Sequence, residues 1–326
     1  MKDRLKELQS RYQPGIDKFL REFLGADHGK KSSFCSEMSA YQLATGGKRL
    51  RALIPCLIYE ILGETAESAI PLGAAAELFH NATLVHDDLQ DSDQMRRGHP
   101  TVWKRYGQAQ AINCGDALFQ YGCRALLEMP MDSGRKLRIL DLAVQSTTKV
   151  IEGQAQEFLM KNEKHPDVQR YVSVARGKTS ALFVFSAVAP LLALGAAPSL
   201  RDLVERAVIE LGVLFQIHDD LLDIYGHKGR ERSGTDLAEG KVSVLAAHVF
   251  ETGGHADQKE LHGILRLPRE ETTAADVQRA IRIFERCDSK HHAENLIESI
   301  RARALKSVAG HHEAAPIIDE LVALFS

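Results

Sequence analysis

The sequence has 326 residues, which is enough for a large hydrophobic core in one or two domains. Hydrophobic residues make up 44% and charged residues 26% of the chain, and the net charge of −3 gives no reason to expect nucleic acid or an anionic membrane surface as a partner. The chain has five cysteines and no Cys-x-x-Cys motif, which predicts reduced thiols. The N-terminus lacks an apolar signal segment, so a cytoplasmic protein is expected.

The spacing of apolar residues predicts an all-α fold, because no stretch alternates polar and apolar residues as a strand does. The first predicted helix, residues 5–23, is expected to break at Pro14. The most apolar run, residues 181–197, is shorter than the ~20 residues that a membrane span needs and is interrupted by Pro190. It therefore predicts a helix buried within a bundle and no transmembrane segment.

A glycine pair and three basic residues form the first chemical signal in the chain, Gly46-Gly47-Lys48-Arg49-Leu50-Arg51. Glycine backbone lets an anion approach closely, and a helix that begins at Leu50 would add its N-terminal amides. The pattern indicates a phosphate site that uses Lys48 and Arg51. Alone, it would instead indicate a basic helix start beside a glycine hinge.

Three carboxylates lie at the end of the next predicted helix, residues 71–88, with Asp87, Asp88 and Asp91 on or beside one face. Like charges so placed repel each other, so a bound cation would explain them, and hard oxygen ligands suit Mg²⁺. Arg96 and Arg97 follow at once, and their guanidinium groups match phosphate oxygens. The alternative is a solvated acidic helix end followed by a basic turn.

The same spacing recurs far downstream in Asp219, Asp220 and Asp223, again directly after a histidine, His218. The separation is much longer than a solenoid period, so the two copies predict two helices that could face each other. Carboxylates on two sides of a cavity would hold several Mg²⁺ ions around one diphosphate, as the ionisation of a diphosphate ester requires.

These motifs and their order resemble those of the trans-isoprenyl diphosphate synthases, the polyprenyl synthetase family. The resemblance covers roughly residues 41–241. The family's two Asp-rich motifs match the two aspartate trios, and three shorter motifs also match. These are Gly-Gly-Lys-Arg-x-Arg at residues 46–51, Arg-Arg-Gly at residues 96–98 and Lys-Thr at Lys178-Thr179.

The resemblance implies a fold, a reaction and an assembly. The fold would be one all-α domain over residues 1–326, an isoprenoid-synthase-type helical bundle around a central cavity, and a homodimer is the family expectation. The enzyme would join isopentenyl diphosphate to an allylic diphosphate, with loss of diphosphate and then of a proton. Several Mg²⁺ ions, about three with diphosphate bound, would serve as cofactors.

The resemblance also assigns the matching residues to the metal, the two substrates and the developing cation. The implied metal ligands are Asp87, Asp88, Asp91, Asp219, Asp220 and Asp223. The implied allylic diphosphate contacts are Arg96, Lys178 and Lys241, and those of isopentenyl diphosphate are Lys48, Arg51, His80 and Arg97. Thr179 and Gln216 would stabilise the cation through their dipoles. For His80 alone, a satisfied core histidine is the alternative.

Product length is expected to depend on the residues before the first Asp-rich motif. Farnesyl-producing members of the family resemble one another in an aromatic residue four or five positions before it, and here those positions are Thr83 and Ala82. A deeper pocket is therefore expected, with Phe79, about one turn lower, as its floor and a product of geranylgeranyl length or longer. Phe183 and Phe185 form the alternative floor.

One stretch departs from the family pattern, because Arg230 stands where a lysine is usual and the loop is one residue longer. The roles of Lys228 and Arg230 as phosphate contacts are therefore open. A terpene cyclase would share the Mg²⁺ chemistry but has no use for an isopentenyl diphosphate site. A non-catalytic partner subunit of a heteromeric synthase would have lost its carboxylates. The intact motifs favour the synthase.

Overall fold

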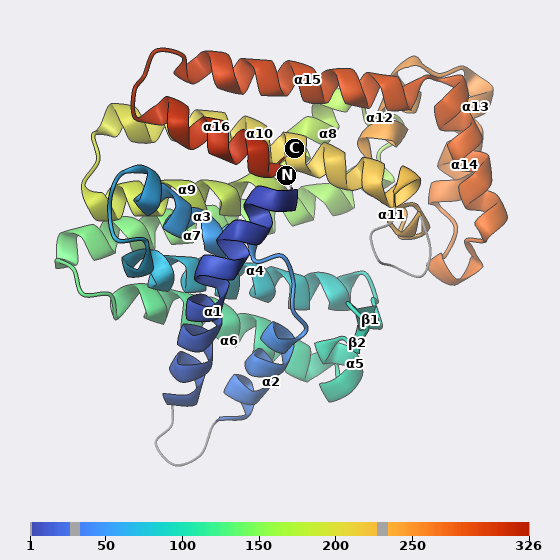
Figure 1. Ribbon diagram of the computed structural model, residues 1–326. Helices are drawn as coiled ribbons and strands as arrows, with labels where there is room; N and C mark the ends of the chain where they lie inside the picture. The colour runs from blue at the N-terminus through green and yellow to red at the C-terminus, as the bar shows by residue number, and fades with distance from the viewer. Residues whose placement is uncertain (1, 27–32, 227–233, 326) are drawn as a thin grey trace. The chain divides into compact units, whose positions relative to one another are not determined.

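The computed structural model describes residues 2–26, 33–226 and 234–325, and these are almost entirely helical (Figure 1). This confirms the predicted all-α fold. The α-helices are α1 (Lys2–Ala26), α2 (Phe34–Ala44), α3 (Leu50–Ile61), α4 (Ile70–Gln90), α5 (Val102–Tyr106), α6 (Gln108–Leu127), α7 (Ser133–Asn162), α8 (Val168–Ala175), α9 (Ala181–Leu194), α10 (Pro198–Tyr225), α11 (Thr235–Ala238), α12 (Val244–Thr252), α13 (His255–Leu265), α14 (Ala274–Arg286), α15 (Ser289–Val308) and α16 (Ala314–Phe325). Two 3₁₀ helices, η1 (Ala66–Ala69) and η3 (Arg269–Glu271), and one π-helix, η2 (Arg176–Ser180), complete the helical set.

The chain divides into two compact units. Unit 1 comprises Met1–Thr148, Leu182–Val208 and Val308–Leu324, and unit 2 comprises Lys149–Ala181, Ile209–Ser307 and Phe325–Ser326. Each unit therefore combines segments that are distant in the sequence, and the long helices α7 and α10 contribute to both. The expectation of one domain over residues 1–326 stays a prediction.

Small residues allow α4 to lie close to its neighbours α3 and α6 in unit 1. A Cβ atom at Gly73 would lie 2.2 Å from the Ala52 carbonyl oxygen of α3, so the two backbones are in direct contact there. On α6, Gly122 leaves room for the ring of Phe79. This packing holds the helix that ends in the first aspartate trio.

The first helix runs unbroken through Pro14, so the predicted break at this residue is wrong. A proline inside a helix removes one backbone hydrogen bond and crowds the preceding turn. Leu8, Tyr12, Ile16 and Leu20 are nevertheless buried along one side of α1, which packs against α3 and α4 within unit 1. Burial of this apolar stripe on both sides of Pro14 offsets the local cost.

A short hairpin follows α4, although no strand is predicted there. β1 (Met95–Arg96) pairs with β2 (His99–Pro100), and Met95 lies opposite Pro100. The two turn residues, Arg97 and Gly98, have φ of 52° and 81°. Two successive left-handed residues are typical of the tight turn that joins two antiparallel strands. The hairpin thereby presents two consecutive arginines.

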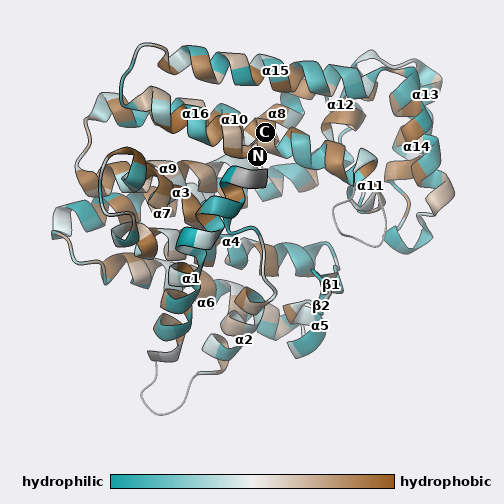
Figure 2. Cartoon of the chain, viewed as in Figure 1, coloured by the Kyte–Doolittle hydropathy of each residue, from teal (hydrophilic) through white to brown (hydrophobic). Residues whose placement is uncertain are grey.

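Amphipathic helices build unit 2, as the alternating colours around α14 show in Figure 2. Ala280, Ile283 and Phe284 are buried along one side of α14. A capping box between Thr273 and Asp276 begins this helix and satisfies two backbone amides that have no partner within it. The apolar face therefore determines the packing of α14 and the cap determines where it begins.

The π-helix η2 lies between α8 and α9 and contains Lys178 and Thr179. A π turn carries one more residue than an α turn and commonly occurs at functional sites. A Cβ atom at Gly153 of α7 would lie 2.3 Å from the Lys178 backbone nitrogen, so this glycine allows the close approach of α7 and η2. The two predicted site residues thus sit on a tightly packed, unusual turn.

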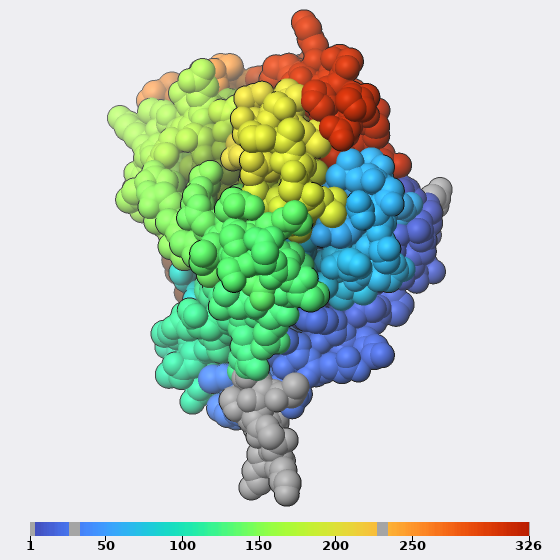
Figure 3. Space-filling view, turned by 90° about the vertical axis from the view of Figure 1, so that its left-hand side faces the viewer, coloured from blue at the N-terminus to red at the C-terminus, as the bar shows by residue number. Residues whose placement is uncertain are grey.

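Val168–Leu194 forms one helical stretch that is long and apolar enough to cross a membrane, but 83% of its most apolar window is buried. A core helix of a bundle has the same composition, which agrees with the predicted buried helix over residues 181–197. The turn from α6 to α7 lies at the surface in Figure 3, beside the segment that joins α9 to α10. Arg135 of α7 donates a hydrogen bond to the Ala193 carbonyl oxygen at 2.9 Å and ties these connections together within unit 1.

Candidate active site

Arg51 and His80 meet in unit 1, one from the start of α3 and the other from α4. Arg51 Nη1 lies 3.5 Å from His80 Nε2, and the guanidinium carbon lies 4.1 Å from the ring centroid of Phe183. Burial holds the pKa of His80 well below its ordinary value, and the charges of Arg51 and Arg97 lower it further. A neutral imidazole beside arginines can hydrogen-bond an anion without adding charge.

The glycine pair before α3 supports Arg97 of the hairpin. Arg97 donates a hydrogen bond to the Gly46 carbonyl oxygen. Gly47 has a φ of 133°, and a Cβ atom there would overlap the Arg97 guanidinium group. Lys48 follows directly and is exposed. We refer to Lys48, Arg51, His80 and Arg97 as the basic cluster. Three cationic side chains together with one neutral histidine suit an anion with several negative charges.

The first acidic cluster, Asp87, Asp88 and Asp91, has one buried and two half-buried members. Asp88 is 1% exposed and accepts hydrogen bonds from Arg96 Nε at 2.7 and 2.9 Å. Burial raises the pKa of Asp88 to about 6, although the Arg96 charge opposes the shift. The buried carboxylate therefore holds Arg96 in place, and the half-buried Asp87 and Asp91 remain accessible from solvent.

Asp220 is the most constrained member of the second acidic cluster, which comprises Asp219, Asp220 and Asp223 in unit 2. Its side chain accepts hydrogen bonds from Gln216 Nε2 and from the Val244 backbone N–H, both at 2.9 Å. Thr179 of η2 in turn donates to Gln216 Oε1 at 2.7 Å. Burial and the neighbouring Asp236 raise the pKa of Asp220 to about 7. The predicted residues Thr179, Gln216 and Asp220 thus form one hydrogen-bonded chain.

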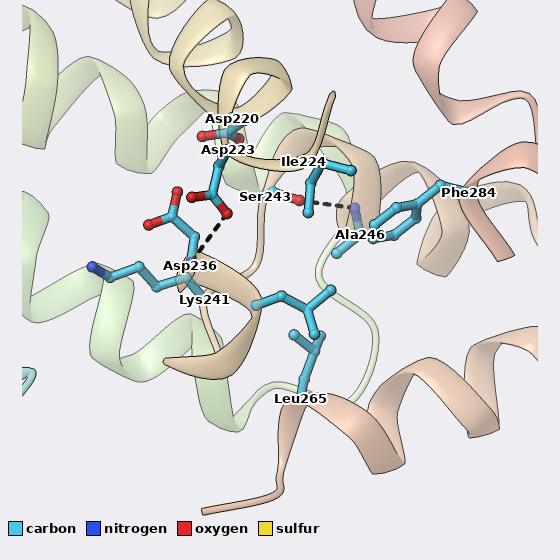
Figure 4. A pocket seen from close by; sticks show the side chains of 10 residues that line it. Asp220, Asp223, Ile224, Asp236, Lys241, Ser243, Ala246, Leu265 and Phe284 are labelled. Atoms are coloured by element: carbon cyan, nitrogen blue, oxygen red, sulfur yellow. Dashed lines mark hydrogen bonds between the residues drawn. The ribbon is translucent and has the colours of Figure 1, made fainter. Parts of the chain in front are cut away.

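Asp223 points into a pocket of unit 2, toward Asp236 and Lys241 (Figure 4). It accepts hydrogen bonds from Thr235 Oγ1 at 2.7 Å and from the Asp236 backbone N–H at 3.2 Å. These bonds join the end of α10 to α11. Asp219, by contrast, is half-buried. Each acidic cluster therefore combines at least one buried carboxylate with at least one that is half-buried.

Both predicted lysines of unit 2 form ion pairs that the sequence pattern did not predict. Lys178 Nζ lies 2.7 Å from Glu157 Oε2, and Lys241 Nζ lies 2.7 Å from Glu239 Oε2. Glu239 is buried, and Arg269 of η3 lies 3.3 Å from its second oxygen. The pairings themselves have no sequence signal, since only the fold brings Glu157 to Lys178 and Arg269 to Glu239.

The donor atoms of the two acidic clusters suit a hard divalent cation such as Mg²⁺. In the described ranges, with residues 27–32 and 227–233 outside them, no group of three or more His, Cys, Asp or Glu side chains is close enough to hold a metal ion. Mg²⁺ usually keeps several water ligands and binds one or two carboxylates together with substrate phosphates. The residues therefore fit Mg²⁺ as an ion whose coordination is completed by water and substrate.

The described site residues fall into two sets, each within one compact unit. Unit 1 holds the first acidic cluster, Arg96 and the basic cluster, and unit 2 holds the second acidic cluster and four further residues, Lys178, Thr179, Gln216 and Lys241. Lys228 and Arg230, whose roles the sequence leaves open, lie outside the described residues. The functional role of each residue stays a prediction.

Known proteins resemble this chain over most of its length. The sequence profile of the polyprenyl synthetase family matches residues 32–284. A geranylgeranyl diphosphate synthase of Methanosarcina mazei is 32% identical over 261 residues, which cover 79% of this chain and 78% of that protein. A geranylfarnesyl diphosphate synthase of Aeropyrum pernix is 30% identical over 255 residues, which cover 76% of this chain and 79% of that protein. The crystal structure of a geranylgeranyl pyrophosphate synthetase from Pyrococcus horikoshii aligns with a TM-score of 0.85 at 25% identity and covers 98% of both chains.

The raised pKa of Asp220 predicts that Asp220→Asn stabilises the metal-free protein at alkaline pH. In the unfolded chain the pKa of this carboxyl is near 3.8, so ionisation destabilises the fold progressively between pH 4 and 7 and by a constant amount above pH 7. We expect a gain of about 1–3 kcal/mol in the free energy of unfolding at pH 8, falling toward zero near pH 4. Denaturant unfolding in EDTA at several pH values measures it. A gain that does not change with pH would contradict the assigned cause.

Proposed function

The chain belongs to the polyprenyl synthetase family, and we propose that it condenses isopentenyl diphosphate with an allylic diphosphate to give geranylgeranyl diphosphate or a longer product. It is a prenyltransferase, a trans-isoprenyl diphosphate synthase. The names of the relatives support the product range, because they include geranylgeranyl and geranylfarnesyl diphosphate synthases. The proposed location is the cytoplasm, which the five free cysteines support.

The basic cluster is the observation that carries this proposal. Lys48, Arg51 and Arg97 supply positive charge, and His80 lies against Arg51 as a neutral hydrogen-bonding partner. A terpene cyclase ionises one diphosphate ester and needs no second diphosphate site. A chain that joins two diphosphate substrates needs one for each, and the resemblance to the family assigns the acidic clusters, Arg96 and Lys178 to the other.

In the proposed reaction the allylic carbon–oxygen bond breaks, and its electron pair leaves with diphosphate. The double bond of isopentenyl diphosphate then attacks the allylic cation, and a proton is lost from the adjacent carbon to restore a double bond. Arg96, Lys178 and Lys241 hold the leaving diphosphate. Thr179 and Gln216 would stabilise the cation through their dipoles. The released diphosphate accepts the proton, since the motifs indicate no side-chain base.

We further propose that the half-buried and the buried aspartates of the acidic clusters have different roles. The half-buried Asp87, Asp91 and Asp219 would contact Mg²⁺, which neutralises the leaving diphosphate when bound. The three buried aspartates already accept hydrogen bonds from protein donors, which supports a positioning role for them. Side chains that do not touch the metal commonly orient the residues that do. The family implies several ions, about three with diphosphate bound.

Phe79 is proposed as the floor that limits product length. The side chain is 1% exposed, and its ring lies 5.5 Å from that of Phe185 and 6.5 Å from that of Phe119, measured between centroids. These contacts hold the ring of Phe79 in one orientation. Of the alternative pair, Phe183 packs under Arg51, whereas Phe185 lies against Phe79 itself. This supports Phe79 over Phe183 as the limiting residue.

A homodimer is proposed, with α7 as part of its interface. Leu137, Val144 and Ile151 are spaced by seven residues, so they share one side of α7, and they are 63%, 52% and 59% exposed. An exposed apolar stripe on one long helix is unusual for a monomer. A second copy of the same helix offers a matching stripe, as a twofold interface requires.

The wild-type enzyme tests the proposed reaction. Purified protein with Mg²⁺ and labelled isopentenyl diphosphate should elongate dimethylallyl, geranyl or farnesyl diphosphate, and the dephosphorylated products should have 20 or more carbons by mass. This range is about four isoprene units, the length the small residues Thr83 and Ala82 permit. Products that stop at 15 carbons would overturn the length assignment. A cyclised hydrocarbon formed without isopentenyl diphosphate would identify a cyclase instead.

Replacing Phe79 by alanine should lengthen the product, because it removes the proposed floor. We expect the main product to gain at least about one isoprene unit, at a stability cost of about 3–5 kcal/mol for the cavity. Phe325→Ala, a buried phenylalanine of α16 that does not line the pocket of Asp223, is the matched control and should leave product length unchanged. An unchanged distribution of product lengths in a folded Phe79→Ala enzyme would refute the assignment of Phe79 as the floor.

Val144→Glu should disrupt the proposed dimer, since it places a charge at the centre of the α7 stripe on both copies. Light scattering after size exclusion should change from twice the chain mass to the chain mass, with Kd raised about 100-fold or more. Gln145→Glu adds the same charge one residue away and should have little effect. A wild-type monomer at micromolar concentration would refute the proposed dimer.

A further inference from the structure

Arg49 is a buried arginine in an unusual backbone conformation, between two members of the basic cluster. Its φ of 52° is left-handed, a backbone conformation that is strained for a residue with a side chain. The residue is only 6% exposed although a guanidinium group cannot lose its charge. Both costs persist only where the surroundings offset them, so the contacts of Arg49 are informative.

The side chain of Arg49 joins three other helices of unit 1. Nη1 lies 2.7 Å from Glu77 Oε1 of α4, and Nη2 donates to the Leu43 carbonyl oxygen of α2 at 2.6 Å. Nε lies 3.5 Å from Asp17 of α1. The backbone carbonyl of Arg49 accepts the first hydrogen bond of α3, from Leu53. One residue thus connects α1, α2 and α4 to the start of α3.

Glu77 is held as firmly as its partner. It is 3% exposed, and its Oε1 also accepts a hydrogen bond from Asn81 Nδ2 at 2.8 Å. Asn81 in turn accepts from Gln42 Nε2 at 3.3 Å, and both side chains are almost fully buried. A buried ion pair with satisfied hydrogen bonds has one geometry, because any displacement leaves a charge unpaired in a low dielectric.

The pair connects the two elements that carry the basic cluster. Lys48 precedes Arg49, and Arg51 lies two residues after it at the start of α3. On α4, His80 lies between Glu77 and Asn81, one turn after the glutamate. The 3.5 Å approach of Arg51 to His80 therefore depends on the distance between α3 and α4 that the ion pair sets.

We propose that the Arg49–Glu77 ion pair is a positioning device for isopentenyl diphosphate, which holds Lys48 and Arg51 at a set distance from His80. The inference rests on the proposed function of the basic cluster and adds to it two residues that touch no substrate. A diphosphate held by several side chains loses affinity when their spacing relaxes, even if every charge is kept. The pair acts on KM for one substrate, because it does not contact the acidic clusters.

A double substitution separates positioning from stability. Arg49→Met together with Glu77→Met replaces the buried pair by apolar side chains of similar length, which is often neutral or stabilising for a fold. We expect a melting temperature within a few degrees of wild type and a KM for isopentenyl diphosphate raised about tenfold or more. KM for farnesyl diphosphate and kcat should stay within about twofold. Arg4→Met with Glu320→Met removes another interhelical ion pair of unit 1 and should leave both KM values unchanged.

The outcomes distinguish this inference from the proposed function, which wild-type turnover tests separately. An unchanged KM for isopentenyl diphosphate in the folded double variant overturns the inference and leaves the function intact. Equal increases in both KM values overturn it too, because they indicate general loosening. If the double variant does not fold, Arg49→Lys keeps the charge but loses the forked contact to Glu77 and Leu43. It should raise KM for isopentenyl diphosphate about threefold, and no change there refutes the proposal.

Discussion

Charge burial is the constraint on which this structure depends. A carboxylate or guanidinium group that leaves water must find partners, and the chain carries many such groups close to helix ends. Asp88 pairs with Arg96, Asp220 accepts from Gln216 and Val244, and Arg49 is joined to Glu77. Apart from the bond from Gln216, which lies on the same helix as Asp220, each of these contacts ties one helix to another segment of the same unit. The electrostatic cost of burying these charges is thus offset by bonds that also organise the fold.

The cations that would bind phosphate are held by carboxylates in the same way. Lys178 lies on Glu157 and Lys241 on Glu239, so both lysines have defined positions without a substrate. An incoming diphosphate competes with those glutamates for the ammonium groups. Ordering a long lysine side chain in advance reduces the entropy lost on binding. We therefore expect these glutamates to influence the proposed site, although no motif includes them.

Sequence reasoning reached the fold class and the motif residues because both depend on local patterns. Helical periodicity predicts the all-α fold, which the structure confirms. The spacing of Asp87, Asp88 and Asp91 predicts metal binding, and this stays a prediction. Sequence reasoning failed where contacts between distant segments determine the structure. Pro14 lies in an unbroken helix that packing stabilises, and Arg269 reaches Glu239 only in the folded chain. The hairpin turn at Arg97 was also missed, because an arginine in a left-handed conformation has no clear sequence signal.

That hairpin has a consequence for how the site tolerates change. Its consecutive residues Arg96 and Arg97 reach different partners, Asp88 of the first acidic cluster and Gly46 before the basic cluster. A single peptide bond therefore links the two neighbourhoods mechanically. A substitution at either arginine alters one of them, but an inserted or deleted residue shifts both together. Evolution can tune the two neighbourhoods separately by exchanging side chains there, and only jointly by changing the length of the turn.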